Sequence, residues 1–337
     1  ELSLEELEQI VNQGEGYTIS DLRRVFDRWY NGHLIETIYP QYRNVETGKH
    51  SIIRQKAVGN AYEELQSMIG LKSAKELIEM ALTYYKAQKV LGKDETNWDR
   101  PAFHMLFTGN AGTAKTTVAR LFAQILKDNG ILSEGKLIEV GRADLVGKYV
   151  GWTAPTVKAF FKKAKGNVLF IDEAYSLLDS NEHLYGDEAI DTIVQEMENH
   201  RNDVVVIFAG YPKMMYDFIA RNPGLRSRIG FHVQFDDYSA EELLEIARLI
   251  AGKNEYTLEA AAEKSLVDFF GKMRKIPDFG NGRFVRNIIE KAMFRQAARL
   301  METEIKHVKE RDIHTLKRED FDFSVDYETN ERKAIGF

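Results

Sequence analysis

The sequence contains no cysteine among its 337 residues. This absence excludes disulfides, thiolate metal sites and a cysteine nucleophile, and it fits the reducing cytoplasm, where we expect the protein to act. Long hydrophobic runs are also lacking, because stretches such as VVVIFAG at 204–210 fall far short of the ~20 apolar residues of a membrane helix. The acidic, amphipathic start ELSLEELEQI does not resemble a signal peptide. We therefore expect no membrane span.

An excess of positive charge is missing as well. The formal net charge is −6, which gives no long-range attraction for nucleic acid, whose binding is dominated by phosphate neutralisation. The densest basic cluster lies in TVKAFFKKAKG, and its helical spacing favours a solvated helix face over a phosphate track. The cluster consists of Lys158, Lys162, Lys163 and Lys165. These features disfavour a nucleic-acid motor, and we expect no nucleic-acid partner.

Short apolar runs alternate with helical patterns from Phe103 to Phe235. Five runs are predicted to be buried strands: FHMLFTG, KLIEVG, NVLFID, VVVIFAG and FHVQF. Strands that alternate with helices predict an α/β fold with a mostly parallel sheet covered on both faces. After this region SAEELLEIARLI opens with a capping box formed by Ser239 and Glu242, and RFVRNIIEKAMFRQAARL has a helical stripe of apolar residues. The segment from about 240 to 320 is therefore predicted to be helical.

The stretch FTGNAGTAKTTVARLFA at 107–123 is similar to the phosphate-binding pattern G-x-x-x-x-G-K-[ST]. A strand, a turn that exposes backbone N–H groups and a helix that points its positive end at the same place suit a bound phosphate. Lys115 would reach the β and γ phosphates, and the hydroxyl of Thr116 would bind Mg²⁺. The predicted nucleotide-binding residues are Gly109, Asn110, Ala111, Gly112, Thr113, Ala114, Lys115, Thr116 and Thr117.

Ala114 occupies a position where the phosphate-binding pattern has glycine. Three interpretations follow: an accidental match, a degenerate loop without activity, or a loop that works with a methyl group. Alanine is a good helix former, so its effect depends on whether φ is negative there and whether the methyl group crowds a phosphate.

Two carboxylates follow the apolar run in NVLFIDEAYSL. They are expected at the carboxyl edge of the sheet, where open α/β sheets bind ligands. Asp172 can hold Mg²⁺, and Glu173 can orient a water for in-line attack on a γ-phosphate. The alternative is that the two acids only end a strand and cap the next helix.

Two arginines, Arg226 and Arg228, lie in RNPGLRSRIGFHVQF between a Pro-Gly turn and the last strand. Guanidinium groups stabilise the charge on a transferring phosphoryl group, and an arginine supplied by a neighbouring subunit makes hydrolysis depend on assembly. Each arginine taken alone is also compatible with simple solvation at the surface.

These motifs, in this order, resemble those of the AAA+ ATPases, together with IGLKSAKELI at 69–78 and GNGRFVRN in the helical region. More narrowly, DLVGKYVGWTAPTVK, VLFIDEAYSL and YGDEAIDTIVQEMENHRNDVVVIFAGYPKMM resemble the CbbX/CfxQ family, which includes activators of red-type Rubisco and the stage V sporulation protein K group. The resemblance covers about residues 60–337. It implies an αβα sandwich with a five-stranded parallel sheet, a small helical lid domain, ATP and Mg²⁺ as cofactors, and a homo-oligomeric ring, expected to be a hexamer, that acts on a protein client.

The resemblance also implies roles for individual residues. Lys115 and Thr116 would contact phosphate and Mg²⁺, Asp172 the metal, and Glu173 the catalytic water. Arg228 would be the arginine finger acting in trans, with Arg226 as the reserve candidate.

In the helical region, Arg283 would sense the γ-phosphate, and Arg286 is the weaker alternative. Ile69 and Gly70 would lie beside the adenine. Tyr211 stands near the position where most AAA+ members have an asparagine sensor, and its role stays open.

Tyr149 in GKYVG resembles the pore loop with which ring-shaped remodellers grip a polypeptide. An aromatic side chain between glycines offers a flat apolar surface on a flexible loop. A buried tyrosine in a turn is the alternative.

The domain prediction has three parts: an N-terminal helical segment and linker at 1–58, an AAA+ nucleotide-binding domain at 59–238 and a helical lid domain at 239–337. The first 30 residues resemble the lid tail of a preceding AAA+ module, so the chain is also considered as part of a tandem protein. Lacking an initiator methionine, it is expected to be a piece of a longer protein or a processed product.

The leading functional hypothesis is an ATP-driven protein remodeller. The alternative is a nucleotide-gated scaffold with negligible hydrolysis, because of Ala114 and the missing asparagine sensor. The other motifs occur in the correct order, which argues against an accidental match to the phosphate-binding pattern. A working nucleotide site is therefore predicted. Replacing Ala114 by glycine is expected to alter ATP affinity by less than about tenfold, or ~1.4 kcal/mol.

Overall fold

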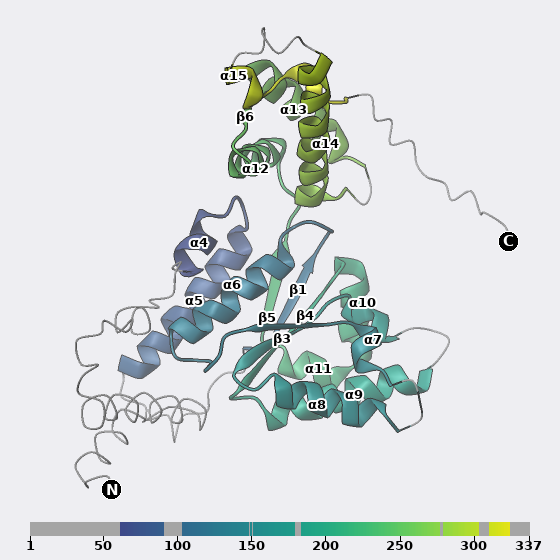
Figure 1. Cartoon of the computed structure of the whole chain (residues 1–337). Helices are drawn as coiled ribbons and strands as arrows, with labels where there is room; N and C mark the ends of the chain where they lie inside the picture. The colour runs from purple at the N-terminus through teal and green to yellow at the C-terminus, as the bar shows by residue number, and fades with distance from the viewer. Residues whose placement is uncertain are drawn as a thin grey trace, which may run out of the picture.

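The fold is a five-stranded parallel sheet between two layers of helices, followed by a second group of helices (Figure 1). The computed structural model describes residues 61–90, 103–147, 149, 151–178, 183–276, 279–302 and 310–323. The strands are β1 (Met105–Gly109), β2 (Leu137–Val140), β3 (Asn167–Ile171), β4 (Val204–Gly210) and β5 (Phe231–Phe235). Their order is β2-β3-β4-β1-β5, and all four neighbouring pairs are parallel. The predicted α/β fold is confirmed, and all five predicted strands form this sheet.

The helices of the sheet domain cover both faces of the sheet. The first layer consists of α4 (Ala61–Ser67), α5 (Lys72–Val90) and α6 (Lys115–Asp128). The other helical segments are α7 (Arg142–Leu145), α8 (Thr153–Lys163), η2 (Ala174–Leu178), α9 (His183–Asn199), α10 (Pro212–Arg221) and α11 (Pro223–Arg228). Because side chains alternate along a strand, Met105 and Phe107 enter the core under α5 and α6, whereas Leu106 enters the opposite core.

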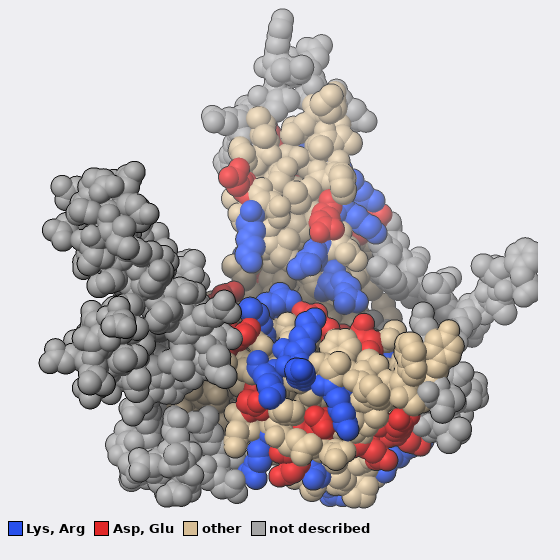
Figure 2. Space-filling view, turned by 60° about the horizontal axis from the view of Figure 1, so that its bottom comes forward, with Lys and Arg blue, Asp and Glu red and all other residues tan. Residues whose placement is uncertain are grey.

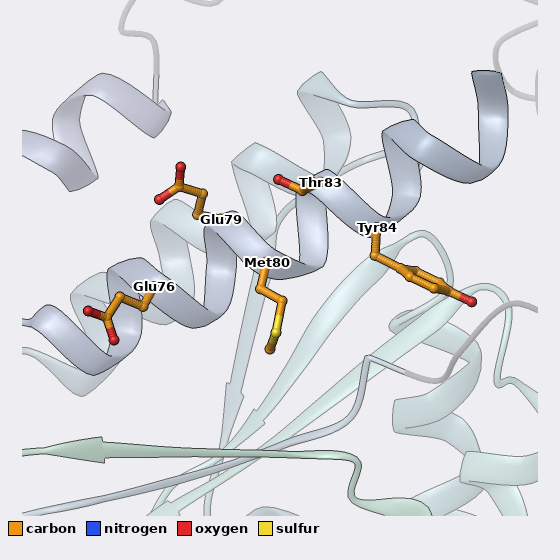
Figure 3. A pocket seen from close by; sticks show the side chains of 5 residues that line it. All are labelled: Glu76, Glu79, Met80, Thr83 and Tyr84. Atoms are coloured by element: carbon orange, nitrogen blue, oxygen red, sulfur yellow. The ribbon is translucent and has the colours of Figure 1, made fainter. Parts of the chain in front are cut away.

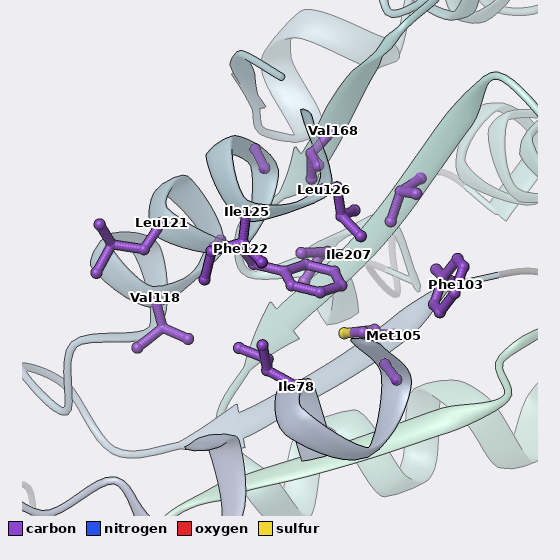
Figure 4. Packing of buried hydrophobic residues seen from close by; sticks show 14 of the residues in the cluster. Ile78, Phe103, Met105, Val118, Leu121, Phe122, Ile125, Leu126, Val168 and Ile207 are labelled. Carbon is purple, nitrogen blue, oxygen red and sulfur yellow. The ribbon is translucent and has the colours of Figure 1, made fainter. Parts of the chain in front are cut away.

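The two cores explain why the strands are nearly continuous runs of apolar residues. All residues of β1, β3 and β4 are buried, as expected for a parallel sheet covered on both faces. Figure 4 shows Ile78 from α5 and Phe122 from α6 directed toward Met105 of β1. The packed sheet therefore holds the loops at its carboxyl edge in fixed positions.

The helical lid follows β5 and has its own core. It consists of α12 (Ala240–Lys253), α13 (Ala260–Met273), α14 (Asn281–Glu302), α15 (Glu310–Ile313) and η4 (Arg318–Asp320). The capping box is confirmed, because the Ser239 hydroxyl accepts a bond from the Glu242 N–H at 3.1 Å and the Glu242 carboxylate accepts one from the Ser239 N–H at 2.7 Å. The predicted apolar stripe of α14 is buried, at Val285, Ile288, Ile289 and Ala292.

Two short strands in the lid were not predicted. They are β6 (Thr257–Leu258) and β7 (Thr315–Leu316), which pair in parallel. A two-residue strand has no periodicity to detect, and its partner lies far away in the sequence. The N-terminal helical segment and linker predicted at 1–58 lie outside the described residues.

The surface carries charges of both signs. On the face turned forward in Figure 2, basic side chains gather near the middle and acidic side chains lie around them. The four lysines of the basic cluster around α8 are exposed, in agreement with a solvated face. Among the described residues, none of the helices combines the length and the apolar character that crossing a membrane would require.

Candidate nucleotide site

The phosphate-binding loop joins the end of β1 to the start of α6. Gly112 has a φ of 72°, and Ala114, the residue before the helix, has a φ of 69°. Left-handed residues in a loop turn successive N–H groups toward one concave side, which suits an anion. Gly109 is required by packing, because a Cβ there would lie 2.6 Å from the Phe235 carbonyl oxygen. The loop and the start of α6 therefore fit nucleotide phosphates.

Ala114 is strained by its conformation. Its φ of 69° and ψ of 20° place it in the left-handed region, which costs an L-residue other than glycine roughly 1–2 kcal/mol. The sequence had left the sign of φ open, and the structure shows that it is positive. A methyl group is thus tolerated at a place where glycine would be unstrained.

Lys115 is folded back along the loop. Its ammonium donates to the carbonyl oxygens of Gly109 and Asn110, both at 2.8 Å. Burial lowers the pKa of Lys115, and attraction to Asp172 opposes this effect. The charge of Asp172, which follows β3, therefore acts on Lys115 at the start of α6.

The two predicted carboxylates lie at the carboxyl end of β3, and both are exposed. The carboxylate of Asp172 accepts a bond from the Glu173 N–H at 3.0 Å. Glu173 has a φ of 48°, which is strained for a residue with a side chain, by roughly 1–3 kcal/mol, and such strain clusters at functional sites.

Tyr175 is a neighbour of Glu173 that the sequence had not indicated. Desolvation, followed by the charge of Glu173 and hydrogen bonding to it, raises the pKa of the Tyr175 hydroxyl to about 12. The ring lies 6.3 Å from the ring of Tyr211, measured between centroids. Gly210 makes room for Tyr175, because a Cβ there would lie 2.8 Å from its ring. Tyr175 and Tyr211 thus lie together near the position at which the sequence lacks an asparagine sensor.

The lid packs directly on the phosphate-binding loop. The N–H of Gly282 donates to the carbonyl oxygen of Gly112 at 3.1 Å. A Cβ on Gly112 would collide with the Gly280 carbonyl oxygen and would lie 2.9 Å from the N–H nitrogen of Arg283. The positive charge of Arg283 also lowers the pKa of Lys115, although less than burial does. The structure therefore brings the predicted lid arginine to the loop.

Ile69 and Gly70 lie between the first helices and the lid. Gly70 has a φ of 64°, and a Cβ there would lie 2.8 Å from a carboxylate oxygen of Glu242 and 3.2 Å from the ring of Tyr238. This segment thus lies against the start of α12. The predicted contact with adenine stays a prediction.

The two candidate arginine fingers lie on α11, away from the loop of their own subunit (Figure 1). The Nε of Arg228 is 3.3 Å from a carboxylate oxygen of Glu198, with only 29% of the Arg228 side chain exposed. Arg226 is exposed. A role in trans for either arginine stays a prediction.

Tyr149 is 64% exposed, so it is not the buried turn tyrosine of the alternative interpretation. Its ring contacts that of Trp152 edge to face, with 5.3 Å between centroids, and Trp152 is 60% exposed. Trp152 was not singled out from the sequence, although it stands only three positions further along.

A surface hollow elsewhere does not coincide with the predicted site. It lies along α5, where Met80 and Tyr84 project from one side of the helix and Glu79 and Thr83 from the other (Figure 3). Among the described residues that line it, none belongs to the phosphate-binding loop.

Comparison with known proteins agrees with the geometry. Residues 105–237 match the family described as "ATPase family associated with various cellular activities (AAA)", and residues 239–331 match the "AAA lid domain". Protein CbbX of Cereibacter sphaeroides is 44% identical over 260 residues, which cover 77% of this chain and 84% of the relative. The chain belongs to the CbbX/CfxQ family of AAA+ ATPases.

Two further relatives of this CbbX/CfxQ ATPase are a Rubisco activase and a sporulation protein. The chloroplastic ribulose bisphosphate carboxylase/oxygenase activase of Cyanidioschyzon merolae is 40% identical over 284 residues, covering 82% of this chain and 97% of the activase. Stage V sporulation protein K of Bacillus subtilis is 39% identical over 275 residues, covering 81% and 83%. Membership of the family makes the chain a nucleotide-binding protein and an ATPase.

The fold of the CbbX/CfxQ ATPase is shared with more distant AAA domains. The crystal structure of the FIGL-1 AAA domain has a TM-score of 0.53 and 19% identity, covering 76% of this chain and 80% of that domain. At this identity the similarity shows the fold alone.

Proposed function

We propose that the chain is a Mg²⁺-dependent, ATP-hydrolysing protein remodeller that assembles into a ring, a hexamer, in the cytoplasm. The observation that carries the nucleotide chemistry of this proposal is the contact between the lid and the phosphate-binding loop, where the Gly282 N–H donates to the Gly112 carbonyl oxygen at 3.1 Å. The charges of Asp172 and Arg283 also act on Lys115 there. We also propose that the nucleotide-binding domain spans 59–238 and the lid domain 239–337.

Each residue at the site has a proposed task. The backbone N–H groups of the loop and the ammonium of Lys115 would hold the phosphates, and Thr116 with Asp172 would hold Mg²⁺. Bound Mg²⁺ would neutralise charge on the β and γ phosphates. Magnesium at nucleotide sites is held largely by phosphates and water, beside one or two protein ligands.

Glu173 is proposed to orient the attacking water. Its carboxylate follows the strand end directly, and its backbone is held by the bond to Asp172 at 3.0 Å. The arginine that stabilises the charge on the transferred phosphoryl group would come from α11 of a neighbouring copy, with Arg228 as first candidate.

Tyr149 is proposed to contact the client polypeptide. It is exposed on the loop that precedes α8, and an aromatic ring can contact varied side chains without fixed hydrogen bonds. One relative is named as the activase of ribulose bisphosphate carboxylase/oxygenase, so a folded enzyme is the kind of client that we propose.

The proposal is tested by separating nucleotide chemistry from client work. Glu173→Gln should bind ATP and lose hydrolysis, whereas Tyr149→Ala should hydrolyse ATP and lose activity on the client. Because the client is unidentified, the Glu173→Gln protein with ATP is first used to capture it by pull-down, with the same variant in ADP as control. If Tyr149→Ala acts normally on a captured client, the contact through Tyr149 is wrong.

A nucleotide-gated scaffold is the second candidate, and the strained φ of Ala114 is the observation that favours it. The remodeller and the scaffold differ in the ATP turnover that they predict. Hydrolysis that increases with protein concentration supports the remodeller, whereas tight ATP binding without turnover at any concentration supports the scaffold.

A further inference from the structure

Asn281, the first residue of α14, is a buried amide at the contact between the lid and the phosphate-binding loop. Its relative exposure is 0%. The side-chain NH₂ donates to the Asp237 carboxylate at 2.7 Å and to the carbonyl oxygens of Ala111 and Phe279, both at 3.2 Å. The side-chain oxygen accepts from the Tyr238 N–H at 3.1 Å. Both ends of the amide are therefore engaged, and one bond reaches the loop itself.

Asp237 connects the same amide to a second point of the loop. The Asn110 side chain donates to both carboxylate oxygens of Asp237, at 3.0 and 2.9 Å. Asp237 follows β5 and precedes the lid, so one carboxylate receives bonds from the loop and from α14. Bonds to an ionised acceptor are stronger than bonds between neutral groups.

The backbone of Asn281 is adapted to this position. Its φ is 45°, a left-handed value that asparagine tolerates better than most residues. The next residue, Gly282, donates its N–H to the Gly112 carbonyl oxygen at 3.1 Å. The first turn of α14 is thus held against the loop by side-chain and backbone bonds together.

We propose that Asn281 is a positioning residue for Arg283. By joining Asp237 and the Ala111 carbonyl, it fastens the first turn of α14 to the phosphate-binding loop and thereby fixes the guanidinium two residues further on. This inference rests on the proposed ATPase site and on the role of Arg283 that the family resemblance implies, which is to sense the γ-phosphate and so to distinguish ATP from ADP. A purely structural asparagine would stabilise the lid without affecting that distinction.

The variant Asn281→Gly tests the proposal, because glycine allows the left-handed backbone while it removes the side-chain bonds. We expect the ratio of ATP to ADP affinity, measured by titration calorimetry, to fall about tenfold. Arg283→Ala should lower the same ratio, and adding Asn281→Gly to Arg283→Ala should change it by less than about twofold, because coupled residues are not additive. Without nucleotide, amide hydrogen exchange at 282–284 should become faster in Asn281→Gly.

Asn254→Gly is the matched control. Asn254 directly follows α12, where its side chain donates to the Ile250 carbonyl oxygen at 2.8 Å. Its replacement should leave the affinity ratio unchanged. If Asn281→Gly does not fold, Asp237→Asn should lower the ratio in its place, because it removes the charge that joins the two asparagines.

An unchanged ratio in folded Asn281→Gly, with a lowered ratio in Arg283→Ala, overturns this inference and leaves the proposed function intact. Fully additive effects of the two substitutions overturn it as well. An unchanged ratio in Arg283→Ala overturns the proposed role of Arg283 and the inference with it.

Discussion

Replacing Ala114 by glycine should stabilise the folded protein without a large change in ATP affinity. Ala114 has a φ of 69° directly before α6, and this conformation costs alanine ~1–2 kcal/mol but costs glycine almost nothing. Glycine also gives the unfolded chain more freedom, which offsets about 0.4–1 kcal/mol of that gain. The net expectation is stabilisation by up to ~1.5 kcal/mol.

The assay is thermal unfolding of both proteins without nucleotide, followed by calorimetric titration with ATP. A gain of about 1 kcal/mol corresponds to a rise of the unfolding midpoint by roughly 2–4 °C for a domain of 150–250 residues. Since the strained φ belongs to the folded chain, it is relieved with and without ATP. The ATP affinity should therefore change by less than about tenfold, or ~1.4 kcal/mol.

Ala111→Gly is the control within the same loop. Ala111 lies outside the left-handed region, so glycine there should destabilise the protein by about 0.4–1 kcal/mol. If Ala114→Gly destabilises the protein to the same extent, the argument from φ is wrong. A gain in ATP affinity well above tenfold would mean that the alanine had been silencing the site.

Two further predictions concern pH and assembly. Burial lowers the pKa of His104 from 6.5 to about 4, so between these pH values the unfolded chain binds a proton that the folded chain does not. The contribution of His104 to the free energy of unfolding should therefore fall by about 3 kcal/mol as the pH drops from 6.5 to 4. Denaturant titrations of His104→Asn should lose this part of the pH dependence. Arg228→Ala should abolish the increase of ATPase turnover with protein concentration. If Arg226→Ala lowers this turnover more than Arg228→Ala does, Arg226 is the arginine that acts in trans.

The strands and the main helices could be predicted because their signals are local. VVVIFAG and NVLFI are apolar throughout, as a strand buried on both faces must be, and they became β4 and β3. The capping box at Ser239 and Glu242 depends on residues three apart. The two-residue strands β6 and β7 have no such local pattern, so they could only be seen in the structure.

The residues of the candidate site also divide into those that local motifs predict and those that only the structure brings together. Lys115, Asp172 and Glu173 belong to short motifs at strand ends, and parallel strands bring their carboxyl ends to one edge. Tyr175 was missed because its partner Tyr211 follows a different strand, and the 6.3 Å between their rings has no signal in the sequence.

By itself, the sequence determined the alternation of strands and helices, the order of the motifs and the family, because each depends on residues close together in the chain. Only the tertiary structure decided that Asn281 joins Asp237 and the phosphate-binding loop, since these bonds connect residues 44 and 170 positions apart. It also decided that φ is positive at Ala114. Because alanine disfavours this angle, the surrounding structure imposes it and the residue at position 114 does not.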